Sequence, residues 1–245
     1  MLYLIGLGLY DERDLSLRAL DSLKECDAVY AETYTCPWHG SLKKLEDMCG
    51  KKITPVERSF LEEDDKKLIE EAKNKDVAIL IPGDPLAATT HASLISGARK
   101  TGTEVRVVHS SSIFSAVAET GLHLYKFGKT ATVAYPEKGY FPKTPYGAIG
   151  ENKKIDAHTL LLLDVKPSRF MTVNEAIDIM LELEEKEKRG LFTEDTFVLG
   201  VGNLGSLKPT MKSGKVRDMK KQKFGETPHV LIVPGKLHFS EEELL

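Results

Sequence analysis

The feature that most constrains the fold of this chain is the segment from Asp76 to Leu94, DVAILIPGDPLAATTHASL. Its apolar run Val77–Ile81 is short and rich in branched residues, which is typical of a buried strand. Pro82 ends the strand because it has no N–H to donate. The apolar spacing from His91 onward is helical. The segment therefore predicts a strand, a tight turn and a helix.

The turn itself, Gly83-Asp84-Pro85, has two interpretations. Gly83 permits a backbone conformation or a close approach that a Cβ would prevent. In an open α/β sheet, ligands bind at the carboxyl ends of the strands, so Asp84 is a candidate ligand-binding residue. The alternative is an ordinary turn with a solvated aspartate, followed by a helix that Thr89 or Thr90 caps.

The rest of the first half repeats this alternation of strand and helix. Strands are predicted at residues 2–9, 26–31, 53–56 and 104–108, and helices at 15–23, 42–48, 62–74 and up to residue 100. Such alternation predicts a doubly wound α/β domain with a parallel sheet. The first strand ends in Gly6-Leu7-Gly8, but Asp11 stands where the dinucleotide-binding fingerprint has its third glycine, so NAD binding is not expected.

A run of serines, Ser110 to Ser112, follows the strand at 104–108. Hydroxyls and N–H groups at a helix start could form a second ligand loop. The alternative, which the pattern alone favours, is capping of the next helix by one of the serines. That helix, Ile113–Leu122, is expected to be buried and to join the two halves of the chain.

The second half has a different pattern. Strands are predicted at residues 130–134, 159–165, 197–201 and 229–233. Residues 135–156 show no apolar period and predict a long surface loop that could act as a lid. Met171–Arg189 is an amphipathic helix. Because only one long helix lies among these strands, we expect a mixed sheet with antiparallel pairs, and two α/β lobes with a cleft between them.

Charge and composition exclude several classes of protein. The 245 residues include 34 basic and 37 acidic ones, a net charge of -3, so a dedicated nucleic-acid-binding role is not expected. The run Lys208–Lys223 predicts a solvated charged loop, with a local basic patch as the alternative. There is no apolar run of membrane-spanning length and no signal-peptide pattern, so we expect a cytoplasmic protein without membrane contact.

Cysteine and glutamine usage give two further expectations. The three cysteines, Cys26, Cys36 and Cys49, match no zinc or redox spacing, so structural thiols and no metal site are expected. Gln222 is the only glutamine. Few thermolabile amides and many charges favour a heat-adapted source.

Several motifs together resemble one family. These are the first strand with its two glycines, YAETYT at 30–35, the PGDPLAATTH turn, and HSSSIFSAVAETGLHLYKFGKTATVAYPE from residue 109. They resemble the archaeal diphthine synthases, which belong to the tetrapyrrole-methylase-like class (class III) of S-adenosylmethionine methyltransferases. The similarity covers essentially the whole chain.

The resemblance implies two domains, 1–112 and 113–245, with S-adenosyl-L-methionine in the cleft, and a homodimer. It implies methylation of a modified histidine of translation elongation factor 2, on the amino group of its 3-carboxy-3-aminopropyl side chain, to give diphthine and S-adenosyl-L-homocysteine. The implied cofactor contacts are Leu9, Asp84, Ala87, Ser112, Ile113, Leu163, Leu204 and His229. From chemistry alone the last three would be taken for core residues.

The implied chemistry suggests further candidates, although no general base is assigned. The trimethylammonium product would suit an acidic or aromatic wall, for which Glu32, Tyr34 and Tyr135 are candidates. The substrate's carboxylate needs a basic partner, for which Arg169 or Lys166 could serve. Competing hypotheses are a methyltransferase acting on a corrinoid precursor or on ribosomal RNA, and a non-catalytic protein that keeps the fold and binds ligand without turnover.

Overall fold

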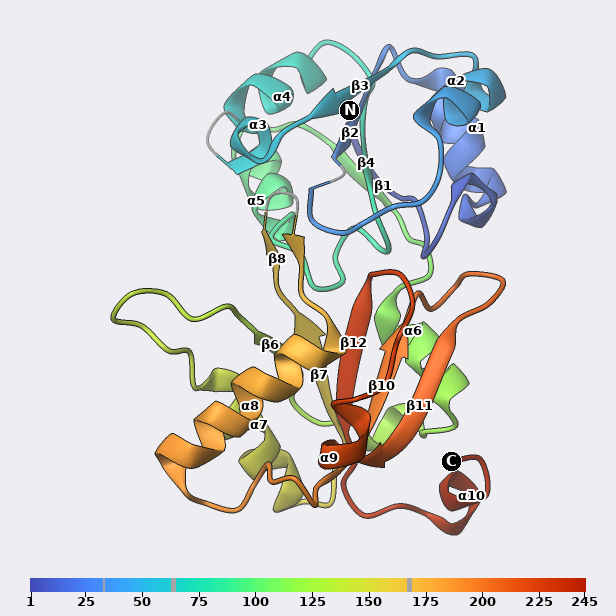
Figure 1. Cartoon of the computed structure of the whole chain (residues 1–245). Helices are drawn as coiled ribbons and strands as arrows, with labels where there is room; N and C mark the ends of the chain where they lie inside the picture. Colours follow the sequence, from blue (N-terminus) through green and yellow to red (C-terminus); the bar gives the residue numbers. More distant parts are fainter. Residues whose placement is uncertain (33, 63–64, 167–168) are drawn as a thin grey trace. The chain divides into compact units, whose positions relative to one another are not determined.

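The computed structural model describes residues 1–32, 34–62, 65–166 and 169–245. Residue 33 of the YAETYT motif and residues 63 and 64 of the helix predicted at 62–74 lie outside that description. The chain forms two units, Met1–Ser115 and Ala116–Leu245, and each has its own five-stranded sheet (Figure 1).

The first unit contains the predicted parallel sheet, with strands in the order β3-β2-β4-β1-β5. The strands are β1 (Leu2–Gly6), β2 (Ala28–Glu32), β3 (Ile53–Val56), β4 (Val77–Ile81) and β5 (Val105–Val108). Every residue of β1 and β4 is buried, because these two strands lie inside the sheet and helices cover both faces. The doubly wound fold predicted for this half is confirmed.

The two faces of this sheet have separate cores. Side chains alternate between them, so Tyr3 and Ile5 pack with α1 (Leu17–Glu25) and α2 (Leu42–Cys49). Leu2 and Leu4 pack on the opposite face. The helices on that face are α4 (Asp65–Ala72) and α5 (Ala92–Lys100); α3 (Arg58–Glu62) precedes α4. The predicted helix 62–74 is thus confirmed over the extent of α4.

The second unit contains the predicted mixed sheet, in the order β11-β10-β12-β7-β6. Its strands are β6 (Ala131–Val133), β7 (Thr159–Leu163), β10 (Phe197–Gly202), β11 (Thr210–Lys215) and β12 (His229–Val233). Only β6 and β7 pair in parallel, and the other pairs are antiparallel. Side chains of α7 (Thr144–Lys153) and α8 (Val173–Glu187) complete the core of this unit.

Helix α7 corrects one prediction, because residues 135–156 were expected to be a loop without secondary structure. The helix has no apolar period because most of its buried residues are small or polar. The buried residues are Pro145, Tyr146, Ala148, Ile149, Gly150 and Asn152. A buried face of this composition does not show the apolar stripe from which amphipathic helices are recognised.

Two further expectations are wrong. The charged run Lys208–Lys223 is not a loop, since it contains β11 and α9 (Val216–Met219). β11 lies at the edge of its sheet, where lysines are tolerated because one side of the strand faces solvent. The buried helix expected at 113–122 is instead α6 (Ile113–Ala116), which buries none of its residues, followed by the 3-10 turn Val117–Thr120.

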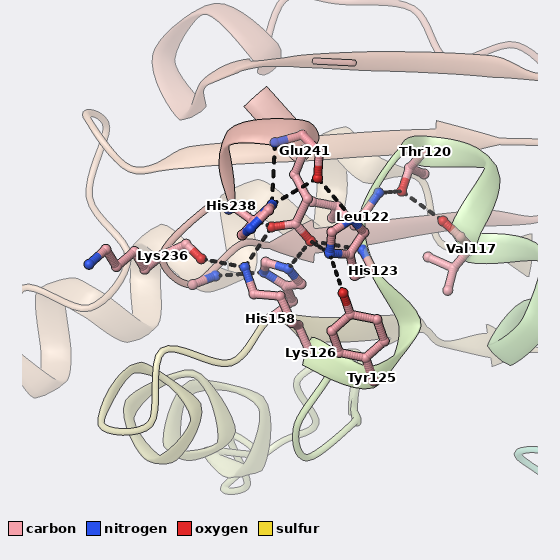
Figure 2. A network of polar contacts seen from close by, with 12 residues as sticks. Val117, Thr120, Leu122, His123, Tyr125, Lys126, His158, Lys236, His238 and Glu241 are labelled. Carbon is pink, nitrogen blue, oxygen red and sulfur yellow. Dashed lines mark hydrogen bonds and ion pairs between the residues drawn. The ribbon is translucent and has the colours of Figure 1, made fainter. Parts of the chain in front are cut away.

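A buried carboxylate holds the C-terminal helix α10 (Phe239–Glu242) in place (Figure 2). Glu241 is fully buried and accepts hydrogen bonds from the backbone N–H groups of His123 and His238, each at 2.8 Å. It also bonds Lys126 Nζ at 2.6 Å and His158 Nε2 at 2.9 Å. Burial alone would raise the pKa of Glu241, but Lys126 and the other donors hold it well below its usual range.

None of the helices in the described ranges is both long enough and apolar enough to cross a membrane. The three cysteines are free thiols. Burial raises the pKa of Cys26 to about 11 and that of Cys36 to about 12. A thiol with such a pKa is protonated and unreactive at neutral pH.

Candidate functional site

Three loops meet at the carboxyl edge of the parallel sheet in the first unit, after β1, β4 and β5. Gly83 N donates to Gly8 O at 2.8 Å, and Gly8 N donates to Gly83 O at 3.2 Å, so the first two loops are joined through their backbones. A Cβ on Gly6 would lie 2.6 Å from Gly83 O and 2.7 Å from Ser110 Cβ. Only glycine allows all three loops to approach this closely.

Asp84 joins the second loop to the third. Its Oδ1 accepts from Leu86 N at 3.0 Å, while Oδ2 accepts from Ser110 N at 3.1 Å and bonds His109 Nδ1 at 2.8 Å. The side chain is only 13% exposed. The alternative of a solvated aspartate is therefore wrong. Asp84 fixes the geometry of this edge. Its contribution to a ligand site is therefore a rigid turn.

The other predicted contacts of this unit lie on the same three loops. Leu9 follows Gly8 and is partly buried. The backbone N–H of Ala87 donates to Asp84 O at 3.1 Å, which closes the turn. Ser112 is buried, and its backbone N–H and C=O both bond the Ser115 hydroxyl. The side chain that bonds the start of α6 therefore belongs to Ser115, outside the serine run from which capping was expected. Ile113 opens α6.

In the second unit, the sheet register brings together the three remaining predicted contacts. Leu163 ends β7, and His229 begins β12 beside it, because Val230 pairs with Leu162 in the antiparallel ladder. Gly202, the last residue of β10, is the partner of His229 on the other side. Leu204 follows two residues later and is 5% exposed. The three residues come from distant parts of the chain and lie at one edge of the mixed sheet.

This edge holds two buried polar atoms that have no hydrogen-bond partner in the described part of the chain: His229 Nε2 and Asn203 Oδ1. His229 Nδ1 accepts from Val173 N at 3.3 Å, so the proton of the neutral ring is on Nε2. Carbonyls of Gly225 and Glu226 face the ring without reaching hydrogen-bond geometry. Burial lowers the pKa of His229, so the ring is neutral at pH 7.

A buried donor and a buried acceptor without partners cost free energy unless a ligand pairs them. A ligand with ring nitrogens and hydroxyls would do so. No three His, Cys, Asp or Glu side chains come together to hold a metal ion within the ranges that the structure covers. The geometry therefore fits an organic ligand that offers both acceptor and donor atoms.

Comparison with known proteins identifies the family. The model of the tetrapyrrole (corrin/porphyrin) methylases matches residues 1–203. Diphthine synthase from Methanocaldococcus jannaschii is 48% identical over 250 residues, covering all of this chain and 97% of that protein. Diphthine synthase from Methanococcus maripaludis is 47% identical with the same coverage. The crystal structure of a diphthine synthase superposes with a TM-score of 0.91 at 39% identity, covering all of this chain and 94% of that one.

The chain belongs to the diphthine synthases of the tetrapyrrole methylase family. It is a methyltransferase with two α/β units, as the resemblance implied. The hypothesis of a fold retained without enzymatic activity is set aside, because relatives that match over their full length are named as synthases.

In this diphthine synthase family member, two of the three residues suggested for a wall around the product cation have other contacts. Glu32 is fully buried and accepts from Thr35 Oγ1 at 2.6 Å. Burial raises the pKa of Glu32, and the bonds from Thr35 oppose that rise. The guanidinium of Arg58 lies over the ring of Tyr34, 5.5 Å from its centre. The Glu32 side chain is therefore closed off from solvent, whereas Tyr34 is partly exposed and stays a prediction.

Sequence reasoning missed two residues at these edges. His91 is 3% exposed, its ring nitrogens have no hydrogen-bond partner among the described residues, and Nε2 lies 3.9 Å from Glu32 Oε1. Burial lowers its pKa to about 4, so the pair does not form an ion pair at neutral pH. His91 is the N-cap of α5 and makes no side-chain cap bond, while Thr89 Oγ1 accepts from the backbone N–H of His91 at 3.4 Å. Asn203, at φ 54°, could have been found from its place between Gly202 and Leu204.

Proposed function

We propose that this chain methylates the amino group of the 3-carboxy-3-aminopropyl side chain on a modified histidine of translation elongation factor 2, within diphthamide biosynthesis. The donor is S-adenosyl-L-methionine, and three transfers give diphthine and S-adenosyl-L-homocysteine. The observation that carries the proposal is the likeness to diphthine synthases over the full length of both proteins.

The proposed cofactor contacts are the eight residues that the resemblance implied. They are Leu9, Asp84, Ala87, Ser112, Ile113, Leu163, Leu204 and His229. Their arrangement supports the assignment, since five lie on the loops joined by Asp84 and three lie at one edge of the mixed sheet. The unpartnered His229 Nε2–H and Asn203 Oδ1 would pair with polar atoms of the adenosine group.

The chemistry asks little of the protein beyond positioning. S-adenosylmethionine supplies a methyl group already activated by its sulfonium. The acceptor amine, with a pKa near the lysine reference of about 10.4, must first lose a proton, and desolvation in the site lowers that pKa. Its lone pair then forms the N–C bond as the C–S bond breaks toward sulfur. The chain holds the two reactants in line and excludes water.

Three properties complete the proposal. The resemblance supports a homodimer. The proposed substrate is a translation factor, which supports action in the cytoplasm. The single glutamine and the abundant charges support a heat-adapted protein, which should melt well above the ordinary mesophilic range of about 45–65 °C. Analytical ultracentrifugation and calorimetric melting test the first and the last.

The experiment that tests the function is mass spectrometry of elongation factor 2 that carries the aminopropyl-modified histidine. After incubation with this chain and S-adenosylmethionine, the modified residue should gain three methyl groups. Calorimetry of cofactor binding runs in parallel. Cofactor binding without any gain of mass would refute the assignment of this acceptor. A corrinoid precursor would then be the next acceptor to test.

A further inference from the structure

Two cations face each other across a short hairpin of the second unit. Its strands β8 (Val165–Lys166) and β9 (Arg169–Phe170) pair antiparallel, and Lys166 and Arg169 are direct partners. Like charges at such positions destabilise a strand pair. Carboxylates lie nearby, with Lys166 Nζ 3.0 Å from Glu137 and Arg169 Nη2 2.7 Å from Glu175. Each cation is thus paired with one carboxylate, and both lie over the same Tyr135 ring, so one further anion placed there could reach both.

The guanidinium of Arg169 is held in place before any ligand arrives. It lies over the ring of Tyr135, 4.3 Å from the ring centre, and Lys166 Nζ lies 5.8 Å from the same centre. Glu175 Oε1 accepts from Arg169, while Glu175 Oε2 is fixed by the backbone N–H and hydroxyl of Thr172 at 2.8 and 2.9 Å. A cation fixed on an aromatic face and a capping box loses little conformational entropy when it binds.

Arg169 nevertheless remains open to solvent. Its side chain is 62% exposed, and that of Lys166 is 41% exposed. A guanidinium has five N–H donors in a planar fork, so the bond from Nη2 to Glu175 leaves donors for a further acceptor. The fork matches a carboxylate, which it can bind through two parallel hydrogen bonds.

The hairpin is connected directly to the sheet edge that carries the proposed cofactor contacts of this unit. β8 follows directly after Leu163 and Asp164, and the backbone of Tyr135 donates to Asp164 Oδ2 at 2.9 Å. After β9 the chain enters α8, whose Val173 N donates to His229 Nδ1. Figure 1 shows the hairpin extending beyond the ends of β6 and β7. A group bound by Arg169 therefore lies beside the edge marked by Leu163 and His229.

We propose that Arg169, assisted by Lys166, binds the carboxylate of the acceptor side chain and so determines which amine is methylated. This inference rests on the proposed function, in which the carboxylate and the amino group sit on the same carbon of the acceptor. Fixing the carboxylate in a fork therefore fixes the nitrogen as well. Tyr135 and Glu175 are positioning residues that act through Arg169.

The test compares two acceptors: elongation factor 2 with the aminopropyl-histidine carboxylate, and the same protein with that carboxylate converted to a neutral carboxamide. Wild type should favour the carboxylate in kcat/KM by roughly tenfold to a hundredfold, the effect of a charged hydrogen bond. R169Q should raise KM for the carboxylate by a similar factor and treat both acceptors alike. R169K should restore part of the preference, because lysine keeps the charge but not the fork.

The matched control is R189Q, because Arg189 is also exposed and also lies over a tyrosine, Tyr146, at 6.0 Å. It should keep the wild-type preference. Cofactor affinity measured by calorimetry should be unchanged in R169Q. Equal losses on both acceptors, or a preference that survives in R169Q, would overturn the assignment of Arg169 alone. If wild type methylated neither acceptor, the proposed function would fail and this assignment with it.

Discussion

The two sheets of this methyltransferase carry their candidate contacts at edges that differ in hydrogen bonding. In the first unit, Asp84 has both carboxylate oxygens bonded to the protein, and Gly6 allows three loops to close around it. In the second unit, His229 Nε2 and Asn203 Oδ1 are buried without partners among the described residues. An edge whose polar groups all bond to the protein is rigid and has a fixed shape. An edge with unpaired polar groups is stabilised when a ligand pairs them. The first edge is therefore closed by the protein's own bonds, and the second leaves two polar atoms for a ligand to pair.

The same contrast appears in two fully buried glutamates. Glu32 of the first unit accepts bonds from neutral groups, and burial raises its pKa. Glu241 of the second unit is also buried, but Lys126 Nζ at 2.6 Å and further donors leave its pKa lowered. Both side chains are closed off from solvent, but desolvation dominates the pKa of Glu32, whereas Lys126 and the backbone donors outweigh it for Glu241.

The largest effect on stability is expected from substitution of Glu241, which tests the contrast between the two buried glutamates. E241Q should lower the free energy of unfolding by about 3–5 kcal/mol at pH 7, because it leaves Lys126 without its buried partner. Urea denaturation measures the loss. E32Q is the matched control and should change stability by less than about 1 kcal/mol, because the donors that bond Glu32 are neutral groups of Thr35 and Tyr34. Equal losses in both variants would contradict the contrast.

The pH dependence of the two glutamates should also run in opposite directions. The lowered pKa of Glu241 means that its stabilisation is present above the unfolded value near 4.5 and is lost as the pH falls below it. The raised pKa of Glu32 means that its contribution is complete below 4.5 and is lost as the pH rises through the folded value. The free energy of unfolding should be measured for wild type, E241Q and E32Q from pH 3 to about 8. The profile of E241Q should lack the loss at low pH, and that of E32Q should lack the loss with rising pH.

A smaller effect tests the closure of the three loops of the first unit. G6V would place a Cβ within 2.6 Å of Gly83 O, so the three loops must separate. Cofactor affinity should fall roughly a hundredfold, about 2.7 kcal/mol by calorimetry. G147A is the control, since a Cβ there meets no atom within 4 Å and should leave binding unchanged. Full affinity in G6V would show that loop closure is not needed for binding.

D84A should weaken cofactor binding at least roughly tenfold, because it releases Ser110 N and His109 and loosens the turn. Its free energy of unfolding should fall by about 1–3 kcal/mol, so affinity and stability decline together. D84N keeps one acceptor oxygen and should lie between D84A and wild type. Unchanged affinity in D84A would remove this turn from the cofactor site.

The smallest effect is expected from H229F, and it sharpens the contrast between the edges. Affinity for the cofactor should fall roughly threefold to tenfold when the Nε2–H donor is lost. Stability should fall by only about 1 kcal/mol, because within the described residues the one hydrogen bond to this ring comes from Val173 N. Affinity equal to wild type in H229F would mean that the unpartnered nitrogen is not a ligand contact.

Much of the first unit could be predicted because its information is local. The strand at 77–81 is a continuous apolar run, and the strand at 105–108 has three valines around Arg106. The turn at Gly83-Asp84-Pro85 consists of residues with special backbone properties. Helix α7 could not be predicted, since most of its buried residues are small or polar and leave no apolar stripe. β11 escaped recognition because an edge strand carries lysine and glycine where a central strand carries apolar residues.

The candidate site divides in the same way. By itself, the sequence determined the family. It also determined the order of strands and helices in the first unit and the loops of that unit, because motifs and backbone preferences act over a few residues. Only the tertiary structure decided that Leu163, Leu204 and His229 share one edge, since strand register joins distant segments. It also decided that Glu241 is paired with a lysine and that Glu32 is not, because the pKa of a buried carboxyl depends on neighbours that the sequence alone does not reveal.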